Sequence, residues 1–403
     1  MGENDTGGYA LAVVAEASIP YARTLIALES AHYAEIERAV ALLFRLSRSE
    51  AFQHRVDPGA SETARHRPGN AGVFMGYDFH LTAAGPRLIE INTNAGGALL
   101  NGLHTAALCD PQRLQCVCAD LLPVETIEAR IVRTFRAEYA AARGADAVLQ
   151  RVAIVDERPA EQFLRGEFDL FRRLFEAAGI EARICDTADL VRDAAGGIRL
   201  GGEAIDLVYL RDTDFGLETG RTSALRAAYL ADEIVVTPSP REHHLLAHKE
   251  RLALFSDAVV LAALGVSSED AAFLVRVVPE THTLAALGLE RAWAERREWV
   301  FKPGAGFGSR GVYRGDKISR RKLDEIAAAG GYLAQRRIEP GAVAVETISG
   351  VERMKFDVRA YAYRDEVLLL GARVYQGQVT NLRTPGGGFS AICVVKGAAV
   401  TQA

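Results

Sequence analysis

The spacing of apolar residues divides the first part of the chain into helical and extended segments. Between Ala15 and Leu46 apolar side chains recur at intervals of three and four residues, which predicts helical hairpin material. The stretch Ser47–Asn70 is polar and contains Pro and Gly, so it is predicted to be a loop. Two extended runs, Val73–Leu81 and Arg87–Asn92, flank a Thr-Ala-Ala-Gly-Pro turn and predict a β-hairpin.

The middle of the chain alternates helical and strand patterns. Amphipathic helices are predicted over Glu125–Ala142 and Ala160–Ala178, the second ending at Gly179, a usual left-handed residue. Short apolar runs predict buried strands at Arg151–Asp156, Ile180–Cys185 and Ile205–Leu210. This alternation indicates an α/β subdomain with parallel pairing over residues 146–245.

The last part of the chain is dominated by strands. A helix carrying Lys249 is predicted after Pro240, and the strand Trp299–Pro303 opens into a glycine-rich loop. Further strands are predicted by β-branched and aromatic residues at Tyr332–Ile338, Ala342–Ile348, Lys355–Tyr363, Glu366–Val374 and Ser390–Val395. We therefore divide the chain into residues 1–145, 146–245 and 246–403.

Composition narrows the class of protein. A chain of 403 residues with 49% hydrophobic and 25% charged residues is expected to fold into two or three packed subdomains. The net charge of -5 offers no basic excess for nucleic acid, and we find no apolar run of transmembrane length and no signal peptide. The five cysteines are odd in number and scattered, so we expect no disulfide framework and a reducing cytoplasm.

The segment from Phe301 to Val312 carries the first chemical signal. It has four glycines in eight positions directly after a strand, and Lys302 precedes them. Glycines let backbone N–H groups turn towards phosphate, and the lysine adds a positive charge. The segment matches neither the GxxxxGK[ST] phosphate loop nor the dinucleotide GxGxxG pattern, so a mobile surface loop is the alternative to a phosphate site.

The predicted hairpin carries the second signal. Glu90 and Asn92 point to the same face of one strand because side chains alternate with period two, and Asp78 on the partner strand can reach the same point. Two carboxylates and an amide oxygen suit Mg²⁺, which accepts incomplete protein coordination. A polar outer face of the hairpin is the alternative, although Leu88 and Ile91 make the flanks apolar.

Two other groups of residues are weaker candidates. His244 and His248 have the i, i+4 spacing of zinc ligands beside His243, but no third ligand completes a site, and a solvated helix start is favoured. Cys116 and Cys118 have no metal-ligand partners, and we interpret them as small apolar residues of a helix.

These motifs resemble a known family. Phe301-Lys302-Pro303 with its glycine loop and the segments Leu88–Gly97, Lys355–Arg359 and Arg373–Gly388 resemble circularly permuted ATP-grasp ligases, specifically glutathionylspermidine synthetases and eukaryotic-type glutathione synthetases. The resemblance implies an α/β (α+β) ATP-grasp fold in permuted order, with N-terminal helices and an inserted Rossmann-like parallel α/β substrate subdomain. In this order the metal motif precedes the glycine loop.

The resemblance also implies roles for individual residues. Asp78, Glu90 and Asn92 would hold Mg²⁺, and Arg359 and Lys302 would act in phosphoryl transfer. The residues that would bind ATP are Lys249, Lys302, Gly304, Gly306, Gly308, Ser309, Gly311, Gln335, Arg336 and Ile338. The residues that would contact substrate are Arg211, Asn94, Arg373, Arg383, Gly386, Gly387 and Gly388. Two features depart from the family: Gly76 replaces an arginine, and the glycine loop lacks a metal-binding glutamate.

The implied activity is ATP-dependent ligation of a carboxylate to an amine through an acyl phosphate, with ADP and phosphate as co-products. The expected cofactors are ATP and Mg²⁺, and the expected partners are small-molecule acids and amines such as amino acids, peptides or polyamines. A homodimer is the candidate assembly, and neither nucleic acid nor membrane is expected as a partner. A small-molecule kinase and a non-catalytic nucleotide-binding module remain the alternatives.

Overall fold

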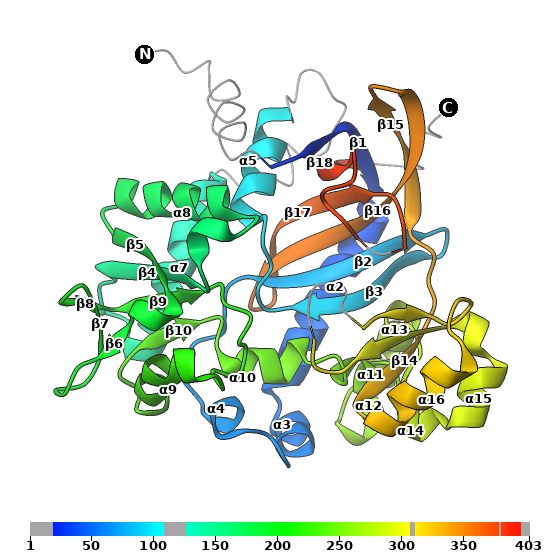
Figure 1. Ribbon diagram of the computed structural model, residues 1–403, viewed down its shortest axis with the longest axis horizontal. Helices are drawn as coiled ribbons and strands as arrows, with labels where there is room; N and C mark the ends of the chain where they lie inside the picture. Colours follow the sequence, from blue (N-terminus) through cyan, green and yellow to red (C-terminus); the bar gives the residue numbers. More distant parts are fainter. Residues whose placement is uncertain (1–18, 109–125, 307–310, 379, 396–403) are drawn as a thin grey trace.

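A computed structural model of the chain describes residues 19–108, 126–306, 311–378 and 380–395. Across these ranges the protein is a mixed α/β structure with four sheets. Figure 1 shows the parallel sheet and its helices on one side of the largest sheet, and a smaller antiparallel sheet with short helices below the other end. No helix in the described ranges combines the length and apolar character needed to cross a membrane.

The largest sheet positions most of the candidate site. In the described part of the chain it has seven strands in the order β1-β18-β17-β16-β2-β3, with β15 beside β16. The strands are β1 (Tyr21–Glu29), β2 (Met75–Thr82), β3 (Gly85–Asn92), β15 (Gly341–Thr347), β16 (Gly350–Tyr363), β17 (Glu366–Tyr375) and β18 (Gly388–Val395). The predicted hairpin is confirmed as β2 and β3, and β2 pairs with β16 from the distant end of the chain.

Side-chain alternation gives this sheet one apolar and one charged face near its centre. Val358 and Ala360 of β16 are fully buried in the core that α2 (Ser30–Arg48) helps to form. The alternate residues Asp357 and Arg359 therefore face the other side of the sheet. The register pairs Arg359 with Asp78 of β2, and Asp78 with Glu90 of β3. The sheet thus brings together charges that are far apart in sequence.

The N-terminal prediction needs two corrections. Tyr21–Glu29 is not helical but forms β1, which pairs in parallel with β18 at the other end of the chain. Its buried residues Ala22, Ile26 and Leu28 have the even spacing of a strand, so long-range pairing decides this segment. The predicted loop Ser47–Asn70 contains two short helices, each with a serine cap, α3 (Glu50–Val56) and α4 (Glu62–Arg65).

The parallel subdomain has the predicted pairing. Its strands have the order β10-β9-β4-β5 and all pairs are parallel. The strands are β4 (Arg151–Asp156), β5 (Glu181–Asp186), β9 (Leu207–Leu210) and β10 (Val235–Thr237), and the helices beside them are α7 (Ile127–Arg143), α8 (Arg165–Ala177) and α9 (Ser223–Leu230). A small sheet lies beside it, comprising β6 (Val191–Arg192), β7 (Ile198–Leu200) and β8 (Glu203–Ile205).

The fourth sheet carries the glycine-rich segment. It has the order β11-β14-β12-β13 and is antiparallel. Its strands are β11 (Thr281–Thr283), β12 (Trp299–Pro303), β13 (Tyr313–Arg314) and β14 (Tyr332–Arg336). The helices in this part of the chain are α10 (Pro240–Glu242), α11 (Arg251–Phe255), α12 (Ala258–Ala263), α13 (Ser268–Val277), α14 (Leu284–Leu287), α15 (Leu289–Ala294) and α16 (Arg320–Ala329). One further helix, α5 (Ala98–Leu108), follows β3.

One further expectation is wrong in detail. Lys249 is not inside a helix but lies in the break between a π-helical turn, His243–Ala247, and α11. Among the cysteines, for which no disulfide framework is expected, Cys393 is disulfide-bonded and Cys185 is free. Cys116 and Cys118 lie outside the described residues.

Candidate active site

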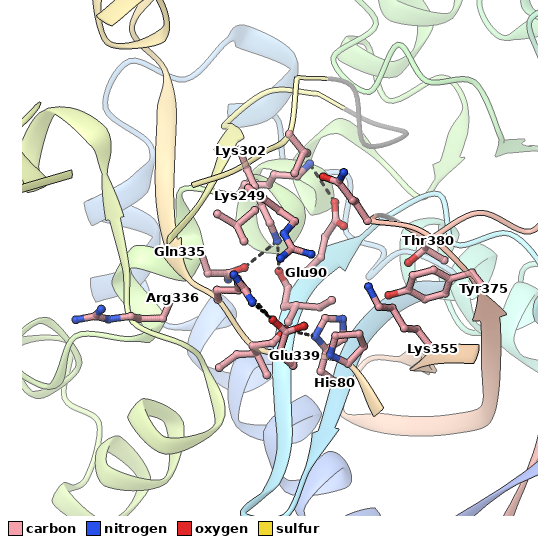
Figure 2. Close-up of a pocket in the computed structure, with 18 of the residues that line it drawn as sticks. His80, Glu90, Lys249, Lys302, Gln335, Arg336, Glu339, Lys355, Tyr375 and Thr380 are labelled. Carbon is pink, nitrogen blue, oxygen red and sulfur yellow. Dashed lines mark hydrogen bonds and ion pairs between the residues drawn. The ribbon is translucent and has the colours of Figure 1, made fainter. Parts of the chain in front are cut away.

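A pocket of about 150 Å³ lies where the fourth sheet faces β2, β3 and the ends of β16 and β17. Figure 2 shows side chains from all of these elements directed into it. Its lining residues are His80, Ile89, Glu90, Lys249, Val300, Lys302, Pro303, Gly306, Val312, Arg314, Gln335, Arg336, Arg337, Ile338, Glu339, Pro340, Lys355, Tyr375, Gln378 and Thr380.

One end of the pocket holds two lysines and a carboxylate. Lys249 Nζ lies 3.1 Å from Glu90 Oε1 and donates to Gly306 O at 2.6 Å. Lys302 Nζ donates to Gln335 Oε1 at 2.8 Å and to Ile89 O at 3.2 Å. Burial lowers the pKa of Lys302 below the ordinary lysine value, and Glu90 opposes this shift. This end of the pocket is suited to a polyanion that would replace Glu90 as the partner of the lysines.

Apolar side chains also line the pocket. They belong to Val300, Ile338 and Pro340, and the charged residues Arg337, Glu339 and Lys355 belong to the same lining. His80 Nδ1 lies 2.8 Å from Ile338 O, and burial lowers the pKa of His80 so that the neutral ring is favoured. An apolar wall with a few fixed polar atoms suits a planar heterocycle.

The two predicted nucleotide contacts on β14, Gln335 and Arg336, point in different directions. Gln335 is 3% exposed and turns towards Lys302. Figure 2 shows Arg336 directed away from Lys302 and Glu90, and its guanidinium pairs with Glu280 at 2.9 Å and lies 4.3 Å above the Trp299 ring. Arg336 therefore borders the pocket through its backbone and stem rather than its charge.

The charged face of the large sheet forms a network beside the pocket. Arg359 donates to both oxygens of Asp78, at 2.6 and 2.7 Å, and Arg373 Nη2 donates to Asp78 Oδ2 at 2.8 Å. Arg373 Nε also donates to Asp357 Oδ1 at 2.7 Å, and Thr380 Oγ1 donates to Asp357 Oδ2 at 2.6 Å. Asp78 and Asp357 are 1% and 0% exposed.

The pKa values follow from these partners. Burial alone would raise the pKa of Asp78, but Arg359 and Arg373 outweigh it and hold that pKa below the ordinary value. Burial likewise opposes the charge of Arg373, but Asp357 and Asp78 raise its pKa above the ordinary arginine value. The charged forms of Asp78 and Arg373 are therefore both favoured by their partners.

The three predicted metal ligands are neighbours but are not equivalent. Both oxygens of Asp78 accept from guanidinium groups, and Asn92 Nδ2 donates to Asp78 Oδ2 at 3.1 Å. The Glu90 side chain is 29% exposed and faces the pocket, and Asn92 keeps its amide oxygen as an acceptor. Glu90 and Asn92 thus fit a Mg²⁺ that takes its other ligands from phosphate and water.

The predicted glycine loop is described only at its ends. Gly304 donates its N–H to Gly331 O at 2.7 Å, so that donor is already used. Gly306 lines the pocket, whereas Gly311, with φ 72°, would bring a Cβ to 2.9 Å from the Tyr332 hydroxyl. Gly308 and Ser309 lie outside the described residues.

The predicted C-terminal loop enters the large sheet. A Cβ at Gly387 would lie 2.5 Å from Val374 O, and one at Gly388 would lie 2.1 Å from Pro20 O. Gly386 has φ 75° and packs near Thr347. These three glycines therefore allow close backbone approach where β18 begins. Arg383 is exposed and lies 5.0 Å from the Phe163 ring.

The predicted substrate residues of the parallel subdomain are buried. Arg211 is 5% exposed, its Nη1 donates to the Tyr209 hydroxyl at 2.8 Å, and its Nη2 lies 3.8 Å from Glu167. Its Nε has no hydrogen-bond partner among the described residues. The Asn94 side-chain amide donates to Arg211 O, and Asn94 Oδ1 is likewise buried without a partner in the described chain.

Several pocket residues were missed from the sequence. Lys355 and Asp357 share the strand face of Arg359, and His80 shares that of Asp78, so period two along the same strands could have found them. Tyr375 likewise shares the face of Arg373 on β17, whereas Thr380 has no such signal because it lies beyond the end of that strand. The histidines after α10 are not solvated: His243 stacks on Phe215 with ring centroids 4.3 Å apart, and burial lowers its pKa to about 3. No cluster of three metal-ligating His, Cys, Asp or Glu occurs in the described ranges.

Comparisons with known proteins give structural neighbours only. No protein-family model matches the sequence, and no curated protein matches it. A solved structure assigned as a gamma-glutamylcysteine synthetase from Methylobacillus flagellatus KT aligns with 15% identity and a TM-score of 0.47, covering 88% of this chain and 85% of that one. The ATP-grasp ligase PsnB with Mg and ADP aligns with 18% identity, TM-score 0.30 and coverage of 56% and 88%.

The D-cycloserine synthetase DcsG is a further neighbour, with 16% identity, TM-score 0.29 and coverage of 60% of this chain and 90% of that one. These neighbours are ligases, but their overall similarity is too low to decide the fold family or the reaction of this chain. The circular permutation and the inserted subdomain stay predictions. The function must be argued from the site itself.

Proposed function

We propose that the protein is an ATP-dependent carboxylate-amine ligase with a circularly permuted ATP-grasp core and the parallel α/β unit as its inserted substrate subdomain. One observation carries this proposal. A single pocket combines two lysines and the carboxylate of Glu90 with the apolar side chains of Val300, Ile338 and Pro340, and it lies beside two arginines held by buried aspartates.

In this proposal ATP spans the pocket. The adenine lies against Val300, Ile338 and Pro340, and the phosphates reach Lys249 and Lys302. Phosphate oxygens would replace Glu90 as the partner of Lys249, which frees Glu90 for a cation. In this proposal the glycine segment after β12 binds the phosphates; Gly304, Gly306 and Gly311 are described, whereas Gly308 and Ser309 lie outside the described residues and stay predictions.

The first chemical step is phosphoryl transfer to the acid. A substrate carboxylate oxygen attacks the γ-phosphorus, the bond from that phosphorus to the β-phosphate oxygen breaks, and ADP leaves with the electron pair. Lys302, Arg359 and Arg373 would neutralise charge on the transferred group, and their fixed positions supply much of the acceleration. Glu90 and Asn92 would hold Mg²⁺, which would supply further positive charge at the phosphates.

The second step forms the amide. The amine attacks the acyl carbon, the C–N bond forms, the C–O bond to phosphate breaks, and one proton is released to solvent. The acid and amine, an amino acid, peptide or polyamine, would enter from the carboxyl ends of β4 and β9, where Arg211 and Asn94 lie. The strand order reverses between these two strands, and ligands of open α/β sheets bind at such a point. Arg383 and Gly386–Gly388 border the other side. A homodimer and a cytoplasmic location stay predictions.

The direct test is isotope transfer. The purified protein is incubated with ATP, Mg²⁺ and pools of amino acids and γ-glutamyl peptides whose carboxylates carry ¹⁸O, with polyamines added as amines, and phosphate and products are analysed by mass spectrometry. The proposal expects ADP, a condensed product and one ¹⁸O in the released phosphate. A stable phosphorylated acid without condensation would instead establish a kinase, and nucleotide binding without ADP release in any pool would favour a binding module.

A further inference from the structure

The carboxylate of Asp78 is held by four hydrogen bonds. It receives two from Arg359, one from Arg373 and one from Asn92. Each oxygen of an ionised carboxylate offers about two lone-pair sites, so Oδ2, which accepts three of these bonds, has no site left. Oδ1 accepts one bond, from Arg359 Nε at 2.6 Å.

The surroundings of Asp78 make an exchange of partners costly. Arg359 is 8% exposed, and the Arg373 side chain is 13% exposed. A divalent cation on Asp78 would remove the main partner of Arg359 and add positive charge beside two guanidinium groups in a region of low dielectric. Gly76, on the neighbouring position of the same strand face, leaves room for this pairing, because a Cβ there would lie 3.3 Å from Cδ and Nε of Arg359.

Glu90 differs from Asp78 in each of these respects. Its side chain is 29% exposed, faces the pocket and has a single lysine as its ionic partner among the described residues. Asn92 is oriented by Asp78: because its Nδ2 donates to Asp78 Oδ2, its amide oxygen is turned away as a free acceptor. Asn92 therefore links Asp78 to the proposed cation site.

We infer that Asp78 is a positioning residue rather than a metal ligand, and that the divalent cation is held by Glu90, Asn92 and nucleotide phosphate. Asp78 holds the guanidinium groups of Arg359 and Arg373 over the transferred phosphoryl group and fixes the amide of Asn92. Asp357 does the same for Arg373 from the other side and links it to Thr380. This inference rests on the proposed function.

The test measures cation binding without turnover. Mn²⁺ binding to the protein–ADP complex is followed by electron paramagnetic resonance for the wild type, Asp78→Asn and Glu90→Gln, with Asp357→Asn as the matched control in the same network. We expect Glu90→Gln to weaken Mn²⁺ binding by about 10-fold or more, and Asp78→Asn to change it by less than about 3-fold, because Asn keeps an acceptor for Asn92. Both Asp variants should lower kcat by about 100-fold through misplaced arginines.

The outcomes separate this inference from the proposed function. If Asp78→Asn weakens Mn²⁺ binding as much as Glu90→Gln does, Asp78 is a metal ligand and the inference is wrong. If the wild type binds no Mn²⁺–ADP at all, the proposed function fails and the inference fails with it. Should Asp78→Asn not fold, a crystal structure of the wild type with ADP and Mg²⁺ decides: Asp78 oxygens at about 2.1 Å from Mg²⁺ overturn the inference, and retained bonds to Arg359 support it.

Discussion

Two groups of buried charges in this protein differ in how completely they are paired. Beside the proposed nucleotide pocket, Asp78 and Asp357 bind two arginines, and each of their four carboxylate oxygens accepts a hydrogen bond. At the carboxyl ends of β4 and β9, Asp156 accepts only from the backbone N–H of Glu157 among the described residues, and Arg211 Nε has no partner there. Asp156 and Arg211 are nonetheless only 8% and 5% exposed.

The first group is already fully hydrogen-bonded, whereas the second has polar atoms that could still bind a ligand. Both arginines of the paired network are hydrogen-bonded to carboxylates before any ligand arrives, as expected for groups whose positions are fixed in advance of the proposed phosphoryl transfer. In the strand-end group, buried polar atoms without hydrogen-bond partners among the described residues destabilise the fold. Burial also raises the pKa of Asp156 to about 7. A substrate with complementary charges would remove that cost, which is why we place substrate there.

The largest expected effect comes from the phosphate end of the pocket. Lys302→Ala removes a fixed cation from the proposed phosphate site, and we expect kcat/KM for ADP release to fall by about 100- to 1000-fold. Lys322→Ala is the matched control, because Lys322 lies on α16 outside the pocket and pairs with Glu325. Equal activity of the two variants would remove Lys302 from the mechanism, provided that both melt like the wild type.

Local patterns predicted the hairpin and the parallel subdomain, while long-range pairing decided the rest. Asp78 and Glu90 were predicted to share one point because both lie on one hairpin, and they are cross-strand neighbours. The pairing of Asp78 with Arg359 joins residues 281 positions apart, which periodicity does not reveal. The same reason explains β1: its partner β18 lies at the other end of the chain, and only that pairing selects strand over helix.

The second effect concerns how the free energy of unfolding depends on pH through Asp156. Its pKa is about 7 in the folded protein and near 3.8 when unfolded, so the folded state binds one more proton between these values. The free energy of unfolding therefore falls as pH rises, by up to about 1.4 kcal/mol per pH unit from this group. Asp156→Asn should flatten that slope in urea unfolding between about pH 5 and pH 7. An unchanged slope would show that Asp156 is already ionised and paired.

The third effect tests whether the strand-end group binds substrate. Arg211→Lys keeps a positive charge but loses the planar fork that binds carboxylates through two hydrogen bonds. We expect the KM of one carboxylate-bearing substrate to rise by about 10-fold, with the KM of ATP unchanged. If both KM values stay at wild-type levels while the melting temperature falls, Arg211 only stabilises the fold through Tyr209 and Glu167. The strand-end group would then be structural, like the arginine network.

The smallest expected effect concerns the pH dependence of ATP binding. Burial lowers the pKa of Lys302, so its phosphate-binding ammonium form is lost at a lower pH than for an ordinary lysine. The affinity for ATP should therefore weaken as pH rises through that pKa, and ATP binding should be accompanied by proton uptake. The side chain in Lys302→Arg stays charged at every pH tested. We expect this variant to bind ATP a few-fold more weakly than the wild type at neutral pH, because the guanidinium has a different shape. Its binding free energy should change with pH by no more than about RT. Titration calorimetry in buffers of different ionisation enthalpy measures both quantities, with Lys322→Arg as the control. A wild-type affinity that does not change with alkaline pH would show that Glu90 keeps Lys302 charged, and the phosphate end would then be as fully paired as the arginine network beside it.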